Sequence, residues 1–234
     1  MEQIKNSGFS LSDIDYLILT HIHLDHAGGT RRFLEKCTSA RAFVPERGLK
    51  HMLNPEILNP SARSILGERI FNSWGPCEPV PNERISPVKP HGKIALGNTQ
   101  LEYVPATGHA PHHNVLRDEK NSTVFSADAL GILDPISHSI VPTTPPPSFD
   151  YEQALEDIQS IRKWLPRLCC LSHFTEIYPN EDYYARVTNR YEKWGEIISS
   201  TVSDGRLAKY DEQILSQTFS RLSDLFSGIS KPFR

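Results

Sequence analysis

The chain has 234 residues, 38% of them hydrophobic, and a formal net charge of −3. This length suffices for one sizeable core, so residues 1–234 are expected to fold as a single domain, and without a basic excess nucleic acid is not an expected partner. No apolar run approaches the roughly 20 residues of a membrane span, and the N-terminus lacks a signal-peptide pattern, so no association with a membrane is expected.

The first third of the chain predicts strands, a helix and a helical insert. Residues 1–15 are polar and end in a short helix and turn, and the apolar run over 16–19 is typical of a buried strand. A helix is expected over 30–37 and a short strand over 41–44. Residues 46–75 form a helical insert broken by two Asn-Pro pairs, either a lid over a site or a surface elaboration.

The rest of the chain predicts a β-rich segment followed by helices. Short strands separated by turn residues are expected at five places: 85–88, 93–96, 100–104, 114–117 and 123–126. A proline-rich extended loop over 141–149 leads into a helix that begins after Asp150 and ends before Pro166. A strand over 168–171 follows, and two amphipathic helices lie within about 180–228.

The four cysteines predict a reducing compartment. Cys37 and Cys77 are isolated, and Cys169 and Cys170 are adjacent. Neighbouring cysteines rarely form a disulfide, and no spacing in the chain is that of a zinc ribbon. We therefore expect free thiols and a cytoplasmic location.

The most informative stretch directly follows the strand over 16–19. Three imidazoles and a carboxylate lie within six residues there: His21, His23, Asp25 and His26. Alternate side chains of an extended segment share a face, so His21 and His23 are expected side by side, while Asp25 and His26 aim at a second point. Nitrogen ligands with a carboxylate suit zinc, iron or manganese better than calcium or magnesium. The stretch therefore predicts a metal site.

This HxHxDH pattern resembles the signature of the metallo-β-lactamase-fold hydrolases, including the glyoxalase-II and lactonase types. Members supply three further ligands: a His after a Gly, an Asp that closes a strand, and a His that closes a later strand. The matching positions here are His109, Asp128 and His173, and the resemblance runs from about residue 10 to about residue 175. It implies an α/β fold of the αββα sandwich type.

The resemblance also implies a binuclear centre. It divides the ligands into two groups that share Asp128: His21, His23 and His109 for one metal, and Asp25, His26 and His173 for the other. Two divalent cations, zinc before iron or manganese, trap a hydroxide that attacks the substrate, because a bound cation lowers the pKa of water. Asp25 is further expected to act catalytically on the proton passed to the leaving group. One of His112 and His113 is expected to support a ligand or meet substrate.

These features favour a hydrolase of a small ester, thioester or lactone. Acyl-homoserine lactonases usually carry a Tyr three residues after the bridging Asp, where this chain has Gly131, and β-lactamases generally lack the Asp found here as Asp128. His23 argues against flavodiiron electron transfer. The alternatives are a phosphodiesterase or ribonuclease with the same metals, and an inactive metal-binding remnant.

The short segment before the signature predicts an incomplete N-terminal sheet. Family members normally place several strands ahead of the signature, whereas 20 residues precede His21 here. We expect an open edge at the strand over 16–19, and a complete second sheet from about 85–127 plus 168–172. Such an edge favours aggregation, marginal stability or a homodimer formed by strand pairing; the other expected partner is a small-molecule substrate. A reading frame that begins upstream is the alternative.

Overall fold

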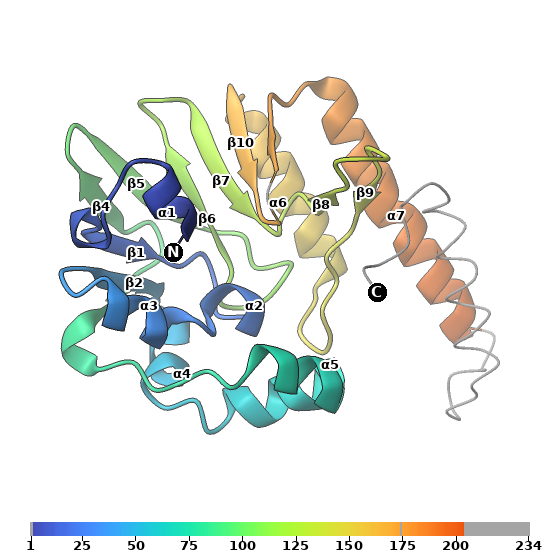
Figure 1. Ribbon diagram of the computed structural model, residues 1–234. Coiled ribbons are helices and arrows are strands. Elements are labelled where there is room, and N and C mark those ends of the chain that lie inside the picture. The colour runs from blue at the N-terminus through green and yellow to red at the C-terminus, as the bar shows by residue number, and fades with distance from the viewer. Residues whose placement is uncertain (1, 174, 204–234) are drawn as a thin grey trace.

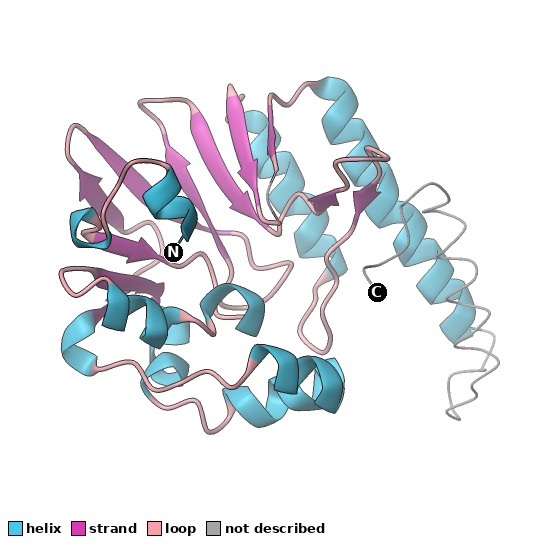
Figure 2. Cartoon of the chain, in the orientation of Figure 1, coloured by secondary structure: helices cyan, strands magenta, loops and turns pink. Residues whose placement is uncertain are grey.

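The computed structural model describes residues 2–173 and 175–203. Figure 1 shows two β-sheets in the middle of the molecule, with helices on their outer faces, and Figure 2 separates the two kinds of element by colour. The helices are α1 (Glu2–Asn6), α2 (Leu24–Ala27), α3 (Thr30–Lys36), α4 (Leu49–Leu53), α5 (Leu58–Trp74), α6 (Tyr151–Lys163) and α7 (Glu181–Ser203). Short 3-10 turns are η1 (Leu11–Asp13), η2 (Glu46–Gly48) and η3 (Asn82–Arg84).

The strands form two main sheets and one small hairpin. The first sheet has the order β1-β2-β3, the second the order β11-β10-β7-β6-β5-β4, and β8 pairs with β9. Their bounds are β1 (Tyr16–Ile18), β2 (Arg41–Pro45), β3 (Ile85–Val88), β4 (Lys93–Leu96), β5 (Thr99–Pro105), β6 (Asn114–Asp118), β7 (Thr123–Ala127), β8 (Ile132–Leu133), β9 (Ile140–Val141), β10 (Leu168–Leu171) and β11 (Glu176–Ile177).

Three apolar clusters hold these layers together. One lies between the two sheets and joins Ile18 and Phe43 of the first sheet to Tyr103 of the second. Another packs the first sheet against the helices that follow it in sequence, with Met52 and Phe71 fully buried. The third packs the second sheet against α6 and α7. This helix–sheet–sheet–helix order is the αββα sandwich that the family resemblance implied.

The strand over 85–88 was assigned to the wrong sheet. β3 does not extend the second sheet; it pairs in parallel with β2, with Ala42 opposite Ile85. A parallel neighbour needs a long crossover connection, and the insert 46–75 supplies one through η2, α4 and α5. A strand followed by helices and another strand was the signal that sequence analysis had available and did not use.

β1 lies at the open edge that was expected. Within the described residues it pairs on one side only, in parallel with β2. Tyr16 is 43% exposed at this edge and its ring lies 5.4 Å from that of Phe43, whereas Leu19, one residue beyond the strand, is buried. The apolar exposure of the edge is therefore concentrated at its first residue.

The helical predictions for the insert and for the first tail helix are confirmed. α4 and α5 occupy the insert, and α5 is interrupted at Gly67, whose φ is +75°. α7 corresponds to the first predicted tail helix, and the second, around 214–226, lies outside the described residues. Within 2–173 and 175–203, no helix has the length and apolar character needed to cross a bilayer.

Helix α6 docks against the loop that carries His109. The amide of Gly108 donates to the Asp157 carboxylate at 2.8 Å, and the amide of Asp150 donates to the Gly108 carbonyl at 2.8 Å. A Cβ on Gly108 would collide with the backbone N and Cα of Ala154. Only glycine allows this approach of loop and helix.

We predict that Gly108→Ala lowers the free energy of unfolding by about 1–3 kcal/mol, because backbone atoms cannot move aside as a flexible side chain could. Urea denaturation of the metal-free protein measures the loss. Gly29→Ala is the matched control, since a Cβ there meets nothing within 4 Å. Its loss should be smaller, limited to the weaker N-cap preference of alanine. Equal losses in the two variants would contradict this account of Gly108.

Candidate metal centre

The segment after β1 brings its polar side chains onto two adjacent faces. His21 is fully buried, and its ring centroid lies 4.8 Å from that of His23, edge to face. The chain then enters the single turn of α2, which carries Asp25 and His26. The turn closes at Gly28, where a Cβ would lie 2.5 Å from a carbonyl oxygen of α2. The backbone thus turns tightly enough for the pair His21 and His23 and the pair Asp25 and His26 to face the same region.

The other three residues come from the second sheet. Asp128 directly follows β7, His173 follows β10, and His109 lies in the loop between β5 and β6. His109 and Asp128 are buried. Ala127 and His173 have φ values of +47° and +61°, a region that non-glycine residues seldom occupy. Strained backbone of this kind concentrates at functional sites, where surrounding contacts hold it in place.

All seven residues singled out in the sequence meet at this one place. They fall into two groups, and within each group one potential ligand atom per residue lies within 4.8 Å of all the others. The groups are His21, His23, His109 and Asp128, and Asp25, His26 and His173. This division was implied by the family resemblance, with Asp128 as the shared member.

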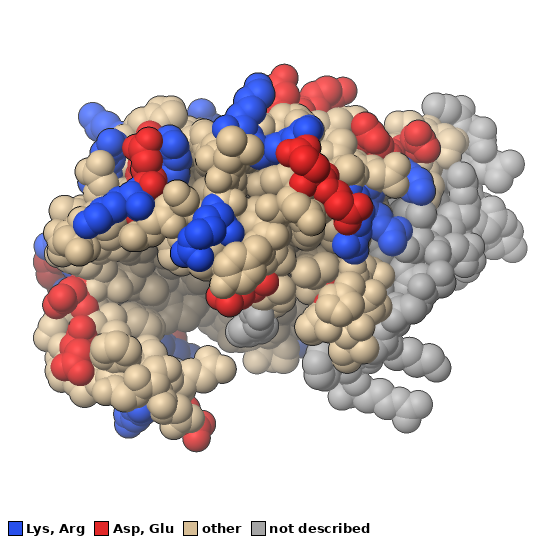
Figure 3. Space-filling view, turned by 90° about the horizontal axis from the view of Figure 1, so that it is seen from above, with Lys and Arg blue, Asp and Glu red and all other residues tan. Residues whose placement is uncertain are grey.

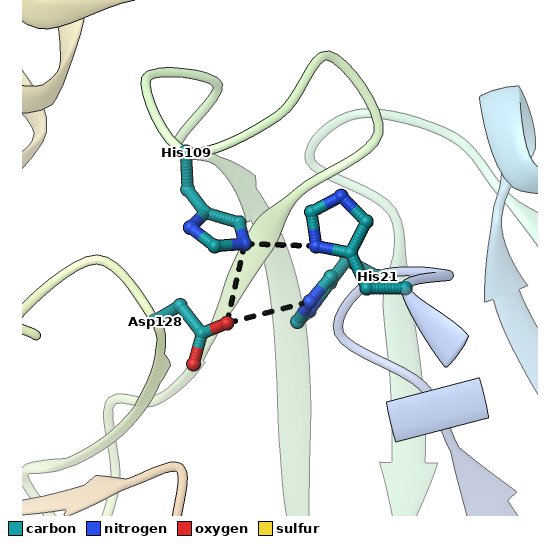
Figure 4. A group of neighbouring side chains, drawn as sticks. His21, His109 and Asp128 are labelled. Carbon is teal, nitrogen blue, oxygen red and sulfur yellow. Dashed lines mark hydrogen bonds and ion pairs between the residues drawn. The ribbon is translucent and has the colours of Figure 1, made fainter. Parts of the chain in front are cut away.

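The Asp128 carboxylate connects the two groups. Its Oδ2 lies 3.5 Å from Nε2 of His21, 3.2 Å from Nε2 of His109 and 3.3 Å from Nε2 of His26. Its Oδ1 lies 3.6 Å from Nε2 of His173. Figure 4 shows His21 and His109 on one side of this carboxylate. One anionic side chain therefore contacts imidazoles of both groups.

Hydrogen bonds fix which nitrogen of His109 faces the cluster. Nδ1 of His109 lies 3.2 Å from the carbonyl oxygen of Thr143, which only an N–H can approach favourably. The proton therefore sits on Nδ1, and the lone pair of Nε2 points inward, 3.0 Å from Nδ1 of His23. A cation-binding tautomer is thus already set in this ring.

Burial and the two carboxylates set the charge of the cluster. Burial holds the pKa of His21 well below its usual value and lowers the pKa of His109 to about 3, so both rings are neutral near pH 7. Burial would also lower the pKa of His26, but the carboxylates of Asp128 and Asp25 outweigh it and raise that pKa to about 9. Burial would raise the pKa of Asp128, yet the neighbouring imidazoles hold it below its usual range.

This polar cluster fits a metal better than it fits a self-contained network. Nε2 of His21, Nε2 of His26 and Oδ1 of Asp128 are buried without a hydrogen-bond partner. His26 lies 3.2 Å from Asp25 and 3.3 Å from Asp128, but without hydrogen-bond geometry. Unpaired buried polar atoms are costly, and a cation bound by these nitrogen and oxygen atoms would satisfy them. The donor set suits zinc, iron or manganese.

His113 contacts the backbone next to the cluster. It is fully buried, its Nδ1 donates to the Ala106 carbonyl at 2.8 Å, and its Nε2 accepts from the amide of Asp128 at 3.2 Å. Burial lowers the pKa of His113 to about 4, which keeps the ring in the neutral form that both contacts require. Of the two histidines considered in the sequence, His113 therefore contacts the backbone of a clustered residue.

Sequence analysis missed a second support, made by Thr143 and Tyr191. The hydroxyl of Thr143 donates to the carbonyl of Asp128 at 2.7 Å, and its own carbonyl faces His109. The Thr143 amide in turn donates to the hydroxyl of Tyr191, a buried residue of α7, at 3.2 Å. The sequence predicts an extended proline-rich loop here, but nothing in it distinguishes this threonine from its neighbours.

Comparisons with known proteins identify the family of the chain. A family model described as the metallo-beta-lactamase superfamily matches residues 1–173. The chain is 27% identical over 189 residues to the metallo-beta-lactamase fold-containing protein ST1585 of Sulfurisphaera tokodaii, covering 78% of this chain and 69% of that protein. It is 26% identical over 175 residues to the probable metallo-hydrolase YybB of Bacillus subtilis, covering 75% of this chain and 71% of that protein.

Solved structures show the same fold. The crystal structure of the archaeal superfamily protein ST1585 matches with a TM-score of 0.64 at 25% identity, covering 75% of this chain and 67% of that one. The family protein TTHA1429 of Thermus thermophilus matches with a TM-score of 0.64 at 18% identity, covering 86% and 67%. Together with the His/Asp cluster, the family match and the curated relatives support a hydrolase with a candidate metal site. The chain belongs to the metallo-beta-lactamase superfamily.

Proposed function

We propose that this protein is a binuclear metal-dependent hydrolase of small esters, thioesters or lactones. The observation that carries the proposal is the buried Asp128 carboxylate, which contacts imidazoles of both side-chain groups. A single shared anion between two groups of histidine and aspartate side chains is suited to two cations a few ångströms apart. Zinc is the first choice, with iron or manganese as alternatives.

The proposed ligand assignment follows the two groups of side chains. His21, His23 and His109 hold one cation, Asp25, His26 and His173 hold the other, and Asp128 is shared. The proton that His26 retains in the metal-free protein leaves when the cation binds, because an imidazole must be neutral to donate its lone pair. The sequence between β1 and α3 therefore supplies four of the seven ligands.

In the proposed hydrolysis the cations and the protein side chains have different roles. When bound, two such cations supply a hydroxide nucleophile, by lowering the pKa of the water they share, and polarise the substrate carbonyl. The protein fixes the ligand rings and keeps Asp25 beside the reacting group. The carboxylate of Asp25 is partly exposed, and contact with His26 holds its pKa below the usual value, against the effect of burial. It is therefore ionised and accepts the proton destined for the leaving group.

The phosphodiesterase or ribonuclease alternative has less support. Basic and acidic side chains are interspersed on the face seen in Figure 3, so that face offers no basic surface for a nucleic acid.

A reducing, cytoplasmic setting is part of the proposal, and the four cysteines, all of them free, support it.

Metal removal tests the proposal directly. We expect the purified protein to hold two metal ions per chain, to hydrolyse a panel of nitrophenyl esters, thioesters and lactones, and to lose turnover with a chelator and regain it with zinc or manganese. Turnover that survives complete metal removal would contradict the mechanism. Hydrolysis of bis(4-nitrophenyl) phosphate or RNA instead of the panel would favour the alternative, and full metal loading with no turnover would indicate a binding remnant.

Two carboxylate substitutions separate the proposed roles. Asp128→Asn should weaken both metal sites, by about 10–100-fold or more, because it removes the shared anion. Asp25→Asn should weaken mainly one site and also depress turnover at saturating metal. Metal titration followed by mass spectrometry measures both. Asp118→Asn is the control, a buried carboxylate in β6 that bonds Thr99 and Asn121 instead of the cluster. Unchanged stoichiometry in Asp128→Asn would show that the shared ligand is misassigned.

The Thr143 support gives a further prediction. Thr143→Val keeps the side-chain shape but removes the bond to the Asp128 carbonyl, and should reduce metal affinity by about 10–100-fold, as loss of an outer hydrogen bond does at other metal sites. Competition with a chromophoric chelator measures the affinity. Thr143→Ser restores the hydroxyl and should bind metal nearly as the parent does. If the valine and serine variants bind equally, the hydroxyl does not position Asp128.

A further inference from the structure

The His/Asp cluster lies at a cavity of about 400 Å³. Five of the seven clustered residues form one side of it, α5 forms the opposite side, and the loop 143–146 closes a third. Figure 1 shows this loop, which follows β9, reaching toward α5. The volume falls within the range of about 300–1,000 Å³ typical of small-molecule sites. The insert, which the sequence left open as a lid or a surface elaboration, therefore supplies a wall of the cavity.

The wall formed by α5 is apolar. Ile65 and Leu66 lie on one face of the helix, and Trp74 reaches the same cavity beyond the interruption at Gly67. Ile132 adds to this apolar lining. Ile65 is 46% exposed and Trp74 is 50% exposed, so the described part of the chain leaves much of both side chains uncovered. Covering such surface with an apolar ligand group is favourable in proportion to the area removed from water.

The cavity offers little to an anionic substrate. Among the described residues that line it, the charged or titratable ones are the clustered histidines and aspartates, and the remaining polar ones are Thr143 and Thr144. Sites that bind carboxylates or phosphates usually present Arg or Lys to them. An anionic substituent placed against α5 would lose its hydration and gain no ion pair.

We propose that α5 is an acyl-binding wall, and that the substrates are neutral esters, thioesters or lactones with an extended apolar acyl group. This inference rests on the proposed hydrolase function and narrows its substrate class. The acyl carbonyl lies at the clustered residues, and the hydrocarbon extends along Ile65, Leu66 and Trp74. Ile65 and Trp74 set the preference for chain length, because their exposed surface is what the hydrocarbon covers.

A series of nitrophenyl esters with acetyl, butyryl, hexanoyl, octanoyl and decanoyl groups tests the preference. On the metal-loaded protein, kcat/KM should rise about two- to fourfold per methylene until the cavity is filled. Trp74→Ala should reduce the ratio of the octanoyl to the acetyl kcat/KM by about tenfold. Ile65→Lys should shift preference toward a hemisuccinyl ester, whose carboxylate it could pair. The control is Ile57→Ser. Ile57 directly precedes α5, is 69% exposed and lies outside the cavity, so this variant should leave the series unchanged.

A binding measurement separates this inference from the proposed function. Decan-2-one and butan-2-one are neutral and cannot be hydrolysed, and ligand-observed NMR reports their binding with or without metal. The longer ketone should bind at least tenfold more tightly, and Trp74→Ala should lower that ratio of affinities by about tenfold. If no ester is turned over but the two ketones differ in affinity as expected, the hydrolase proposal is wrong and the acyl-binding role of α5 is supported. If esters are turned over with no dependence on acyl length or on Trp74, or if hemisuccinyl esters are preferred by the unaltered protein, the acyl wall is wrong and the hydrolase proposal stands.

Discussion

The carboxylate of Asp128 is the constraint on which the site depends. It is buried, held ionised by neighbouring imidazoles, and one of its oxygens has no hydrogen-bond partner. A buried charge of this kind is costly unless it is paired, so the fold must surround it with compensating groups. His26 compensates in the metal-free protein by retaining a proton, and a bound cation would do so more completely. By itself the cluster is therefore destabilising, and a bound cation would stabilise it.

Hydrogen bonds to the backbone of Asp128 fix the position of that carboxylate. Its backbone amide is bonded to His113 and its carbonyl to Thr143, and the strained φ of Ala127 directly precedes it. Tyr191 ties Thr143 to α7, so the position of Asp128 depends on packing between the second sheet and its outer helices. A short chain of hydrogen bonds therefore connects α7, through Tyr191 and Thr143, to the backbone of Asp128.

The sequence predicted what depends on local pattern and missed what depends on packing. The HxHxDH stretch and the strands that end near Asp128 and His173 were identifiable, because a ligand run after an apolar strand is a local signal. The roles of Thr143 and Tyr191 were not, since they depend on contacts between segments 15 to 48 residues apart. The misplacement of β3 has the same origin: its residues identify a strand, but only the crossover before it decides which sheet it joins.

That crossover explains why the insert should not be regarded as a lid added to a finished fold. Its helices connect β2 to β3, their buried residues Met52 and Phe71 belong to the core of the first sheet, and the same segment presents Ile65 and Trp74 to the cavity. Ala62 and Leu66 do both, because they pack against that core and also line the cavity. A family whose ligands are fixed by metal chemistry can change specificity on such a surface, because the wall is built on an element that the fold already requires.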